Sequence, residues 1–177
     1  MRLLSGAGEA TGISLGLPRG GRAEIDPSTL PHLVAEDFAI VVESNRLIVA
    51  DRRMTWDVAA GYGSHASTGA PAPATTWYFA EGATIAGFQA FYLLQNPGED
   101  STQVTVQYLL QNGAREVRHH LVPARSRVTV WVNQEGTPLD AAEFAAVVTA
   151  STPIVAERAM YRDGPASRSR RAAMRWA

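Results

Sequence analysis

Apolar and polar residues alternate along residues 102–111, and this pattern predicts a β-strand. Every second position is apolar there: Val104, Val106, Tyr108 and Leu110. Successive side chains of a strand point to opposite faces of the sheet, so such a stretch can bury one face. The dipeptide Asn112-Gly113 follows, a favoured two-residue hairpin turn because both residues tolerate a positive φ. A second strand is therefore expected over 115–122, with Val117, His119 and Leu121 on one face.

Five further strands are expected around this hairpin. Residues 127–133 alternate, with Val128, Val130 and Val132 inward and Thr129 and Trp131 outward. The others are expected over 77–81, 88–95, 144–149 and 154–161. The last two should form a hairpin across 150–153, and 134–143 should hold one helical turn with Asp140 as its N-cap. Seven short strands separated by turns predict an all-β fold, an antiparallel β-sandwich.

The chain also contains an internal repeat. Residues 38–54 recur as residues 144–160, at an offset of 106, with identical Phe, Ala, Val-Val, Ile-Val-Ala, Arg and Met positions. Upstream, residues 17–22 match residues 122–127 at an offset of 105, and Arg2-Leu3-Leu4 matches Tyr108-Leu109-Leu110. Self-similarity at a fixed period is the sequence signature of repeated structural units. The chain therefore contains two copies of one unit.

This duplication divides the chain into four parts. Residues 1–60 are expected to be a truncated first repeat that lacks its opening strands, and residues 76–161 a complete β-sandwich repeat. Residues 61–75 are rich in glycine, serine, alanine and proline and are expected to be a linker. Residues 162–177 carry five arginines against one aspartate and are expected to be a disordered tail. The chain is interpreted as a fragment of a longer repeat protein.

Several motifs of the second copy resemble known families. They are TWYFAEG at 76–82, LLQNPGEDSTQVTVQYLL at 93–110, VPARS at 122–126 and FAAVVTASTPIVAERAMY at 144–161. Together they resemble a domain of unknown function that is repeated in tandem in large bacterial exported proteins. The same order of features is similar to the sensory rhodopsin transducer family. That resemblance implies a soluble, compact antiparallel β-sandwich without a catalytic centre, which assembles as an oligomer and is likened in fold to carbohydrate-binding modules.

Composition narrows the possible chemistry. The chain has 177 residues, of which 46% are hydrophobic and 19% charged, with a formal net charge of −1. All 16 basic residues are arginine, and there is no lysine or cysteine. The lack of cysteine excludes disulfides, thiol catalysis and thiolate metal sites, and the lack of lysine excludes Schiff-base chemistry and a P-loop. The near-zero charge offers no general field for nucleic acid or membranes.

The candidates for ligand or interface contacts are Trp131, Trp77, Tyr78 and Glu81. Exposed tryptophan and tyrosine rings can stack on sugar rings or partner proteins, although core packing is the alternative for most of them. Trp131 is the strongest candidate because it alternates with inward-facing valines. Glu81 follows the aromatic strand, where an ion pair with an arginine is the alternative.

No catalytic residue, metal ligand or cofactor is predicted. His119 and His120 are adjacent in a predicted strand and so point to opposite faces, which prevents them from sharing a metal ion. Glu157-Arg158 and its counterpart Asp51-Arg52 carry carboxylates, but nothing in the sequence brings two of these together as a glycosidase requires. The chain is therefore not expected to be an enzyme.

The sequence favours a structural or protein-interaction module, part of a larger bacterial surface or exported protein. The truncated first repeat leaves a sheet edge and an apolar face without their strands, which favours a protein partner or self-association. The alternative is a carbohydrate- or small-ligand-binding, transducer-like module. No nucleic-acid partner and no membrane span are expected. The N-terminus lacks the pattern of a secretory signal, so both a cell-surface and a cytoplasmic location stay open.

Overall fold

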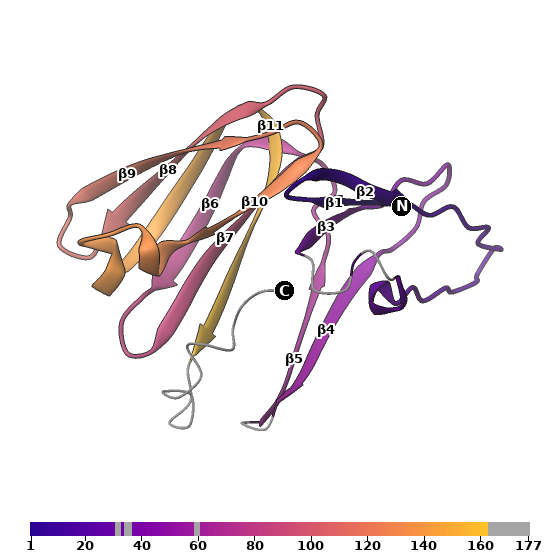
Figure 1. Cartoon of the computed structure of the whole chain (residues 1–177), viewed down its shortest axis with the longest axis horizontal. Coiled ribbons are helices and arrows are strands. Elements are labelled where there is room, and N and C mark those ends of the chain that lie inside the picture. The colour runs from indigo at the N-terminus through magenta and orange to yellow at the C-terminus, as the bar shows by residue number, and fades with distance from the viewer. Residues whose placement is uncertain (31–32, 34–36, 59–60, 163–177) are drawn as a thin grey trace.

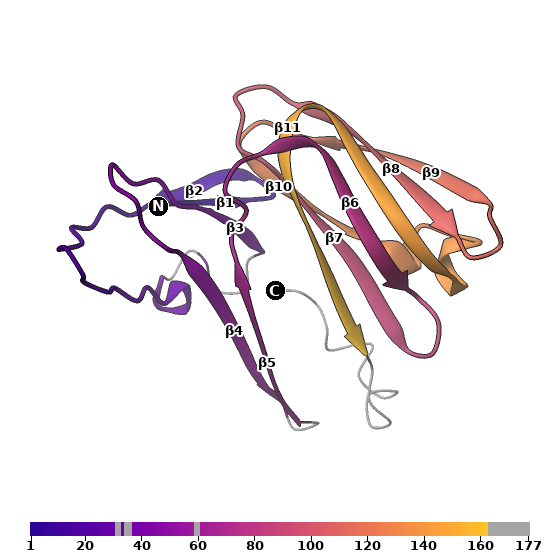
Figure 2. The ribbon, with the colours of Figure 1, turned by 180° about the vertical axis from the view of Figure 1, so that it is seen from behind.

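The computed structural model describes residues 1–30, 33, 37–58 and 61–162, and these residues form antiparallel β-structure (Figure 1). The predicted all-β fold is confirmed. The chain forms a C-terminal sandwich, residues 74–162, and an N-terminal half that lies beside it (Figures 1 and 2). The predicted tail lies outside the described residues except for Arg162.

The C-terminal sandwich contains six strands: β6 (Ala74–Ala83), β7 (Phe88–Asn96), β8 (Thr102–Leu110), β9 (Arg115–Val122), β10 (Ser126–Trp131) and β11 (Glu143–Arg162). They form two sheets that share β11. In the β8 sheet, the first half of β11 lies between β6 and β8, and β9 lies beside β8. In the β7 sheet, β7 lies between β10 and the second half of β11. The predicted strands correspond closely to β7, β8, β9 and β10.

The hairpin predicted across residues 150–153 is wrong, because these residues belong to one continuous strand. β11 changes its pairing partners there, and its register with β6 shifts between Thr149 and Ile154. Side chains replace ladder hydrogen bonds at this crossing. The Thr102 Oγ1 atom accepts from the Thr152 N–H at 3.1 Å, and the Ser151 Oγ atom accepts from the Gln103 N–H at 3.1 Å. Pro153, which has no N–H to donate, therefore fits in a strand without forming a turn.

The core lies between the two sheets and follows the predicted alternation. Val104, Val106 and Tyr108 of β8 are fully buried, as is Val132, and Val130 is almost fully buried. On β9 the apolar face predicted from the alternation is the solvent face, since Val117 and Leu121 are exposed. The helical turn predicted between β10 and β11 is present as the short 3-10 helix η4 (Leu139–Ala141), following η3 (Val132–Gln134). Asp140 lies inside that turn, so its prediction as N-cap is wrong.

The described residues of the N-terminal half form five strands: β1 (Arg2–Ser5), β2 (Gly8–Gly12), β3 (Phe38–Val41), β4 (Asp51–Val58) and β5 (Gly61–Thr68), with the 3-10 helix η1 at Pro27–Thr29. β1 lies between β2 and β3 in the β1 sheet, and β4 pairs with β5 in a separate hairpin. The predicted linker therefore differs from the structure. Residues 61–68 form β5, paired with β4 along its whole length, and only residues 69–73 connect it to β6.

The β1 sheet has the same strand order as part of the β8 sheet. The order β2-β1-β3 corresponds to β9-β8-β11, and every pair is antiparallel. Leu3 pairs with Ile40 as Tyr108 pairs with Ala146, so Leu3 corresponds to Tyr108 and not to Leu109 as the sequence match suggested. The offset in this strand is thus 105. Leu3 and Tyr108 are both fully buried, as expected for equivalent positions.

Candidate functional site

The outer face of the β7 sheet is covered in part by the N-terminal half. β10 contacts β1, β2 and β3, and the β1 sheet lies beside β10 in both views (Figures 1 and 2). Phe91, Gln95 and Arg127 are buried on this face, although their side chains point away from the core of the sandwich. A surface that would face solvent in an isolated sandwich is therefore an interface between the two halves.

Asp37 and Arg127 form one polar contact of this interface. The Asp37 Oδ2 atom lies 3.5 Å from Arg127 Nη1, and it accepts a hydrogen bond from the Thr129 Oγ1 atom at 3.3 Å. The Arg127 side chain is only 9% exposed. Burial lowers the pKa of Arg127 and the Asp37 carboxylate raises it, but an arginine stays charged in proteins. The interface therefore holds a nearly buried cation that needs its acidic partner.

Arg52 and Glu157 form the second polar contact. The Arg52 Nη2 atom of β4 lies 2.5 Å from the Glu157 Oε1 atom of β11, and both side chains are about one-third exposed. The same guanidinium reaches the Ser67 Oγ atom of β5 at 3.4 Å. Burial raises the pKa of the nearby Tyr161 hydroxyl, with Arg52 opposing this change. The β4–β5 hairpin is thus joined to the sandwich by a charged hydrogen bond.

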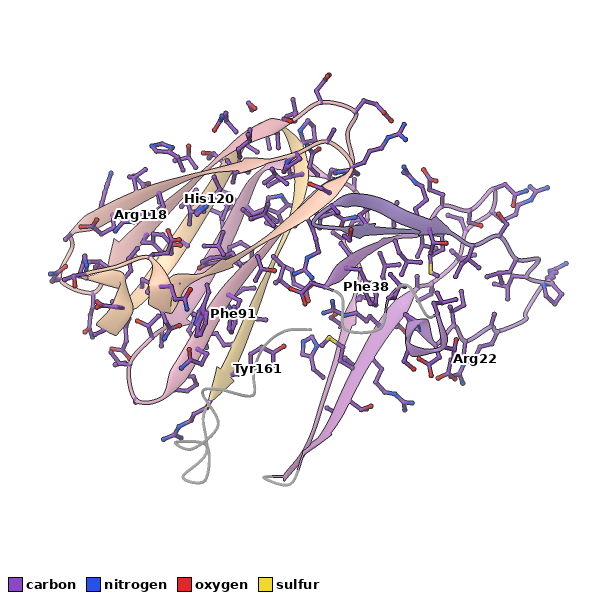
Figure 3. The ribbon with its side chains drawn as sticks, viewed as in Figure 1. Arg22, Phe38, Phe91, Arg118, His120 and Tyr161 are labelled. Atoms are coloured by element: carbon purple, nitrogen blue, oxygen red, sulfur yellow. The ribbon has the colours of Figure 1, made fainter. Side chains whose placement is uncertain are left out.

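Trp131 lies on the outer face of the β7 sheet, the orientation predicted from its alternation with valines. Its ring stacks on Phe91 with 5.6 Å between centroids. Phe91 also meets Tyr161 edge-on, with 6.0 Å between centroids; both residues are labelled in Figure 3. Its Nε1–H group donates to the Gln89 Oε1 atom at 2.9 Å. The Trp131 ring is half-buried by these contacts, so it belongs to an aromatic cluster on this face.

The other three predicted residues come together at the opposite edge of the sandwich. A shallow hollow of about 450 Å³ there is lined by Trp77, Tyr78, Phe79, Ala80, Glu81, Ala156, Glu157 and Arg158. The Trp77 Nε1–H group donates to the Ile154 carbonyl oxygen at 3.0 Å, and its ring packs against the core. Tyr78 is 77% exposed, and Arg158 donates to the Glu81 carbonyl oxygen. Tyr78 and Glu81 are therefore accessible, whereas Trp77 is largely structural.

Sequence reasoning missed a polar cluster on the inner face of β9. Arg118 donates through Nη1 to Glu116 at 3.2 Å and through Nη2 to the Glu135 carbonyl oxygen at 3.2 Å (Figure 3). The His120 Nε2 atom lies 3.7 Å from the Glu135 carboxylate. Burial lowers the pKa of His120, and Glu135 opposes that change. The sequence did contain a signal for this cluster, because Glu116, Arg118 and His120 occupy every second position of β9. The prediction considered only the apolar face of this strand.

His119 points away from this cluster, as predicted for neighbours in a strand. Its Nδ1 atom lies 3.1 Å from the Thr105 Oγ1 atom, on the exposed side of β9. The residues that the structure describes contain no group of three His, Asp or Glu side chains placed to hold a metal ion. Among these same residues, no helix is long and apolar enough to cross a membrane.

No known protein-family profile matches the chain, and no curated protein matches it. Solved structures do match. A Thermotoga maritima protein, 1070, is 14% identical over 53% of this chain and 85% of its own, with a TM-score of 0.50. The Anabaena sensory rhodopsin transducer is 23% identical over 48% of this chain and 95% of its own, with a TM-score of 0.42. The first likeness supports the fold.

Proposed function

We propose that this chain is a non-catalytic structural module of a tandem β-sandwich repeat protein, and that successive units dock through the two polar contacts described above. The supporting observation is that each of the two similar units carries charged residues at the positions of both sides of the interface. The residues of the interface and their counterparts in the other unit form four pairs: Asp37 and Glu143, Arg52 and Arg158, Arg127 and Arg22, and Glu157 and Asp51. The sign of the charge is the same within every pair.

This pattern is what a linear array of repeats requires. In such an array each unit contacts the one before it and the one after it. Each unit therefore needs two complementary surfaces, one for each neighbour. Asp37 and Arg52 are the N-terminal half's contribution to the present interface, and Arg127 and Glu157 are the contribution of the sandwich. Three of their four counterparts, Glu143, Arg22 and Asp51, are exposed, where a further unit can reach them, and the fourth, Arg158, is half-buried.

Backbone geometry supports the same correspondence. Gly8 and Gly113 both have a positive φ, 116° and 85°; Gly8 is the first residue of β2, directly after the turn that follows β1, and Gly113 lies in the turn that follows β8. Gly20 and Arg125 also have a positive φ, 69° and 50°, two residues after Pro18 and Pro123 respectively. A positive φ is uncommon outside glycine, so the Arg125 position marks a shared turn. In this proposal the module belongs to the exported or cell-surface proteins that its motifs resemble.

Exchange of the Arg52 and Glu157 charges tests the docking. Arg52→Glu places two carboxylates together, and we expect the halves to separate, with a larger radius of gyration in small-angle scattering and a loss of about 1 kcal/mol of stability. The double variant Arg52→Glu with Glu157→Arg should restore the wild-type radius. Arg53→Glu is the matched control, because the neighbouring Arg53 is exposed and lies 3.9 Å from Glu24. Equal effects of the Arg52 and Arg53 substitutions would count against the docking contact.

A second candidate function is carbohydrate or small-ligand binding at the hollow between β6 and β11. The observation that favours it is the exposed Tyr78 ring beside the Glu81 and Arg158 side chains, since binding modules stack sugars on flat aromatic faces and hold hydroxyls with charged groups. On a glycan array, a signal lost in Tyr78→Ala and kept in Trp131→Ala supports this site. A signal lost only in Trp131→Ala places binding on the β7 sheet, and no signal with the wild-type chain removes this function.

A further inference from the structure

The outer edge of β3 carries no strand among the residues that the structure describes. β3 pairs with β1 on one side only. In the C-terminal sandwich the corresponding strand, the first half of β11, pairs with β8 on one side and with β6 on the other. Since the strand order agrees and β3 pairs with β1 in the same register as β11 pairs with β8, the position next to β3 is the equivalent of the position that β6 occupies.

Apolar side chains are uncovered where that strand would lie. Val42 is 45% exposed and Ile48 is 42% exposed, whereas their counterparts Val148 and Ile154 are fully buried. Leu47 and Val49, in the same segment between β3 and β4, are more exposed still. Monomeric proteins rarely leave such neighbouring apolar residues in water unless the surface meets a partner.

We propose that the outer edge of β3 binds an additional antiparallel strand that has the sequence pattern of β6. Free strand edges accept extended peptides through main-chain hydrogen bonds, and side-chain pockets select among them. In the C-terminal sandwich, Trp77 of β6 pairs with Val148 and Phe79 pairs with Ala146. The corresponding positions are Val42 and Ile40, so the strand that fits carries aromatic residues two positions apart.

A glycine three residues after the second aromatic residue is the other requirement. Gly82 of β6 pairs with Phe144, and a Cβ atom added at Gly82 would lie 2.2 Å from the Phe144 ring. Phe38 of β3 corresponds to Phe144. The strand bound at β3 therefore needs glycine opposite Phe38, because any larger residue meets the ring. The recognised pattern is that of residues 76–82, and it distinguishes this site from a general affinity for extended peptides.

The test is a binding titration with a fluorescein-labelled peptide of the β6 sequence, residues 74–83, added to the full chain. We expect saturable binding by fluorescence anisotropy, weakened by about tenfold or more when Val42→Asp places a charge on the apolar positions. Leu121→Asp is the matched control, because Leu121 is an exposed apolar residue on the outer face of β9. Circular dichroism of Val42→Asp is recorded beside the titration, to check that the variant keeps its fold.

The peptide has its own controls. Gly82→Val in the peptide should abolish binding, whereas Tyr78→Ser should leave it nearly unchanged, because Tyr78 points to solvent in the sandwich. Failure of the wild-type peptide to bind, or binding that Val42→Asp leaves intact, overturns the proposal. A dimer that Val42→Asp dissociates and that the peptide does not compete with also overturns it, since the occupant is then a second copy. None of these results depends on the Arg52–Glu157 contact, so the docking proposal stands or falls separately.

Discussion

At the scale of single residues, the inner face of the sandwich contains more polar chemistry than its apolar alternation suggests. The Tyr92 and Tyr108 rings are fully buried, with centroids 6.1 Å apart. Burial raises the pKa of both hydroxyls, so both stay protonated above the ordinary tyrosine value near 10. The Glu135 carboxylate adds to this effect at Tyr108, while Arg118 opposes it. The charged residues of the polar cluster therefore affect the pKa of a tyrosine in the core.

His120 makes the stability of the fold depend on pH. Burial lowers its pKa below the ordinary value of 6.5, so the unfolded chain takes up a proton more readily than the folded chain. Stability is therefore complete above pH 6.5 and is lost as the pH falls from 6.5 toward the lowered value. We expect the melting temperature to fall between about pH 7.5 and about pH 5.5, and His120→Gln to reduce that fall.

His119→Gln is the control for this prediction, because His119 lies on the exposed side of the same strand. The measurement is thermal unfolding followed by circular dichroism at both pH values. The assignment to His120 is contradicted if the two variants show the same dependence on pH. Acid sensitivity at lower pH has another source, since the hydrogen bond from Arg125 lowers the pKa of the Glu99 carboxyl from its usual range near 4.5.

At the scale of elements, the crossing of β11 between sheets depends on two side chains. The Thr102 Oγ1 atom lies 3.0 Å from the Ser151 Oγ atom and accepts from the Thr152 N–H. Thr102 is fully buried, so its removal leaves polar groups without partners. We expect Thr102→Val to lower the free energy of unfolding by about 1–3 kcal/mol in urea titrations.

Thr105→Val provides the comparison on the same strand. Thr105 has its hydroxyl on the exposed side, next to His119, so its loss should change stability by less than about 0.5 kcal/mol. A similar loss for both variants would show that the effect belongs to threonine in β8 generally and not to the crossing.

The elements that sequence alone predicted are those whose partners lie nearby in the chain. β8 and β9 follow from alternation and from the Asn112-Gly113 turn between them. The continuity of β11 could not be predicted, because Ser151-Thr152-Pro153 is typical of a turn and its hydrogen bonds are to distant Thr102. β5 was missed because its sequence is polar and rich in small residues. It forms a strand through its pairing with β4, which the sequence does not reveal.

At the scale of the whole molecule, the similarity of residues 38–54 to residues 144–160 was visible in the sequence, but the contacts between the N-terminal half and the sandwich were not. Asp37 and Arg127 are separated by 90 positions in the sequence, and neither lies in a motif that indicates an interface. The candidate residues showed the same limit. Alternation placed Trp131 on the correct face, yet its stacking on Phe91 and the hollow beside Tyr78 depend on how strands of different sheets meet.

The shared strand β11 has a consequence for synthesis of the protein. β7 and β10 pair with each other, as do β8 and β9, but among the described strands β6 pairs only with β11 and the two pairs are joined only through it. Because β11 is the last of these strands in the chain, it leaves the ribosome after all the others. The sandwich therefore cannot close during translation until residues near Tyr161 have emerged, and its apolar inner faces stay open to chaperones until then.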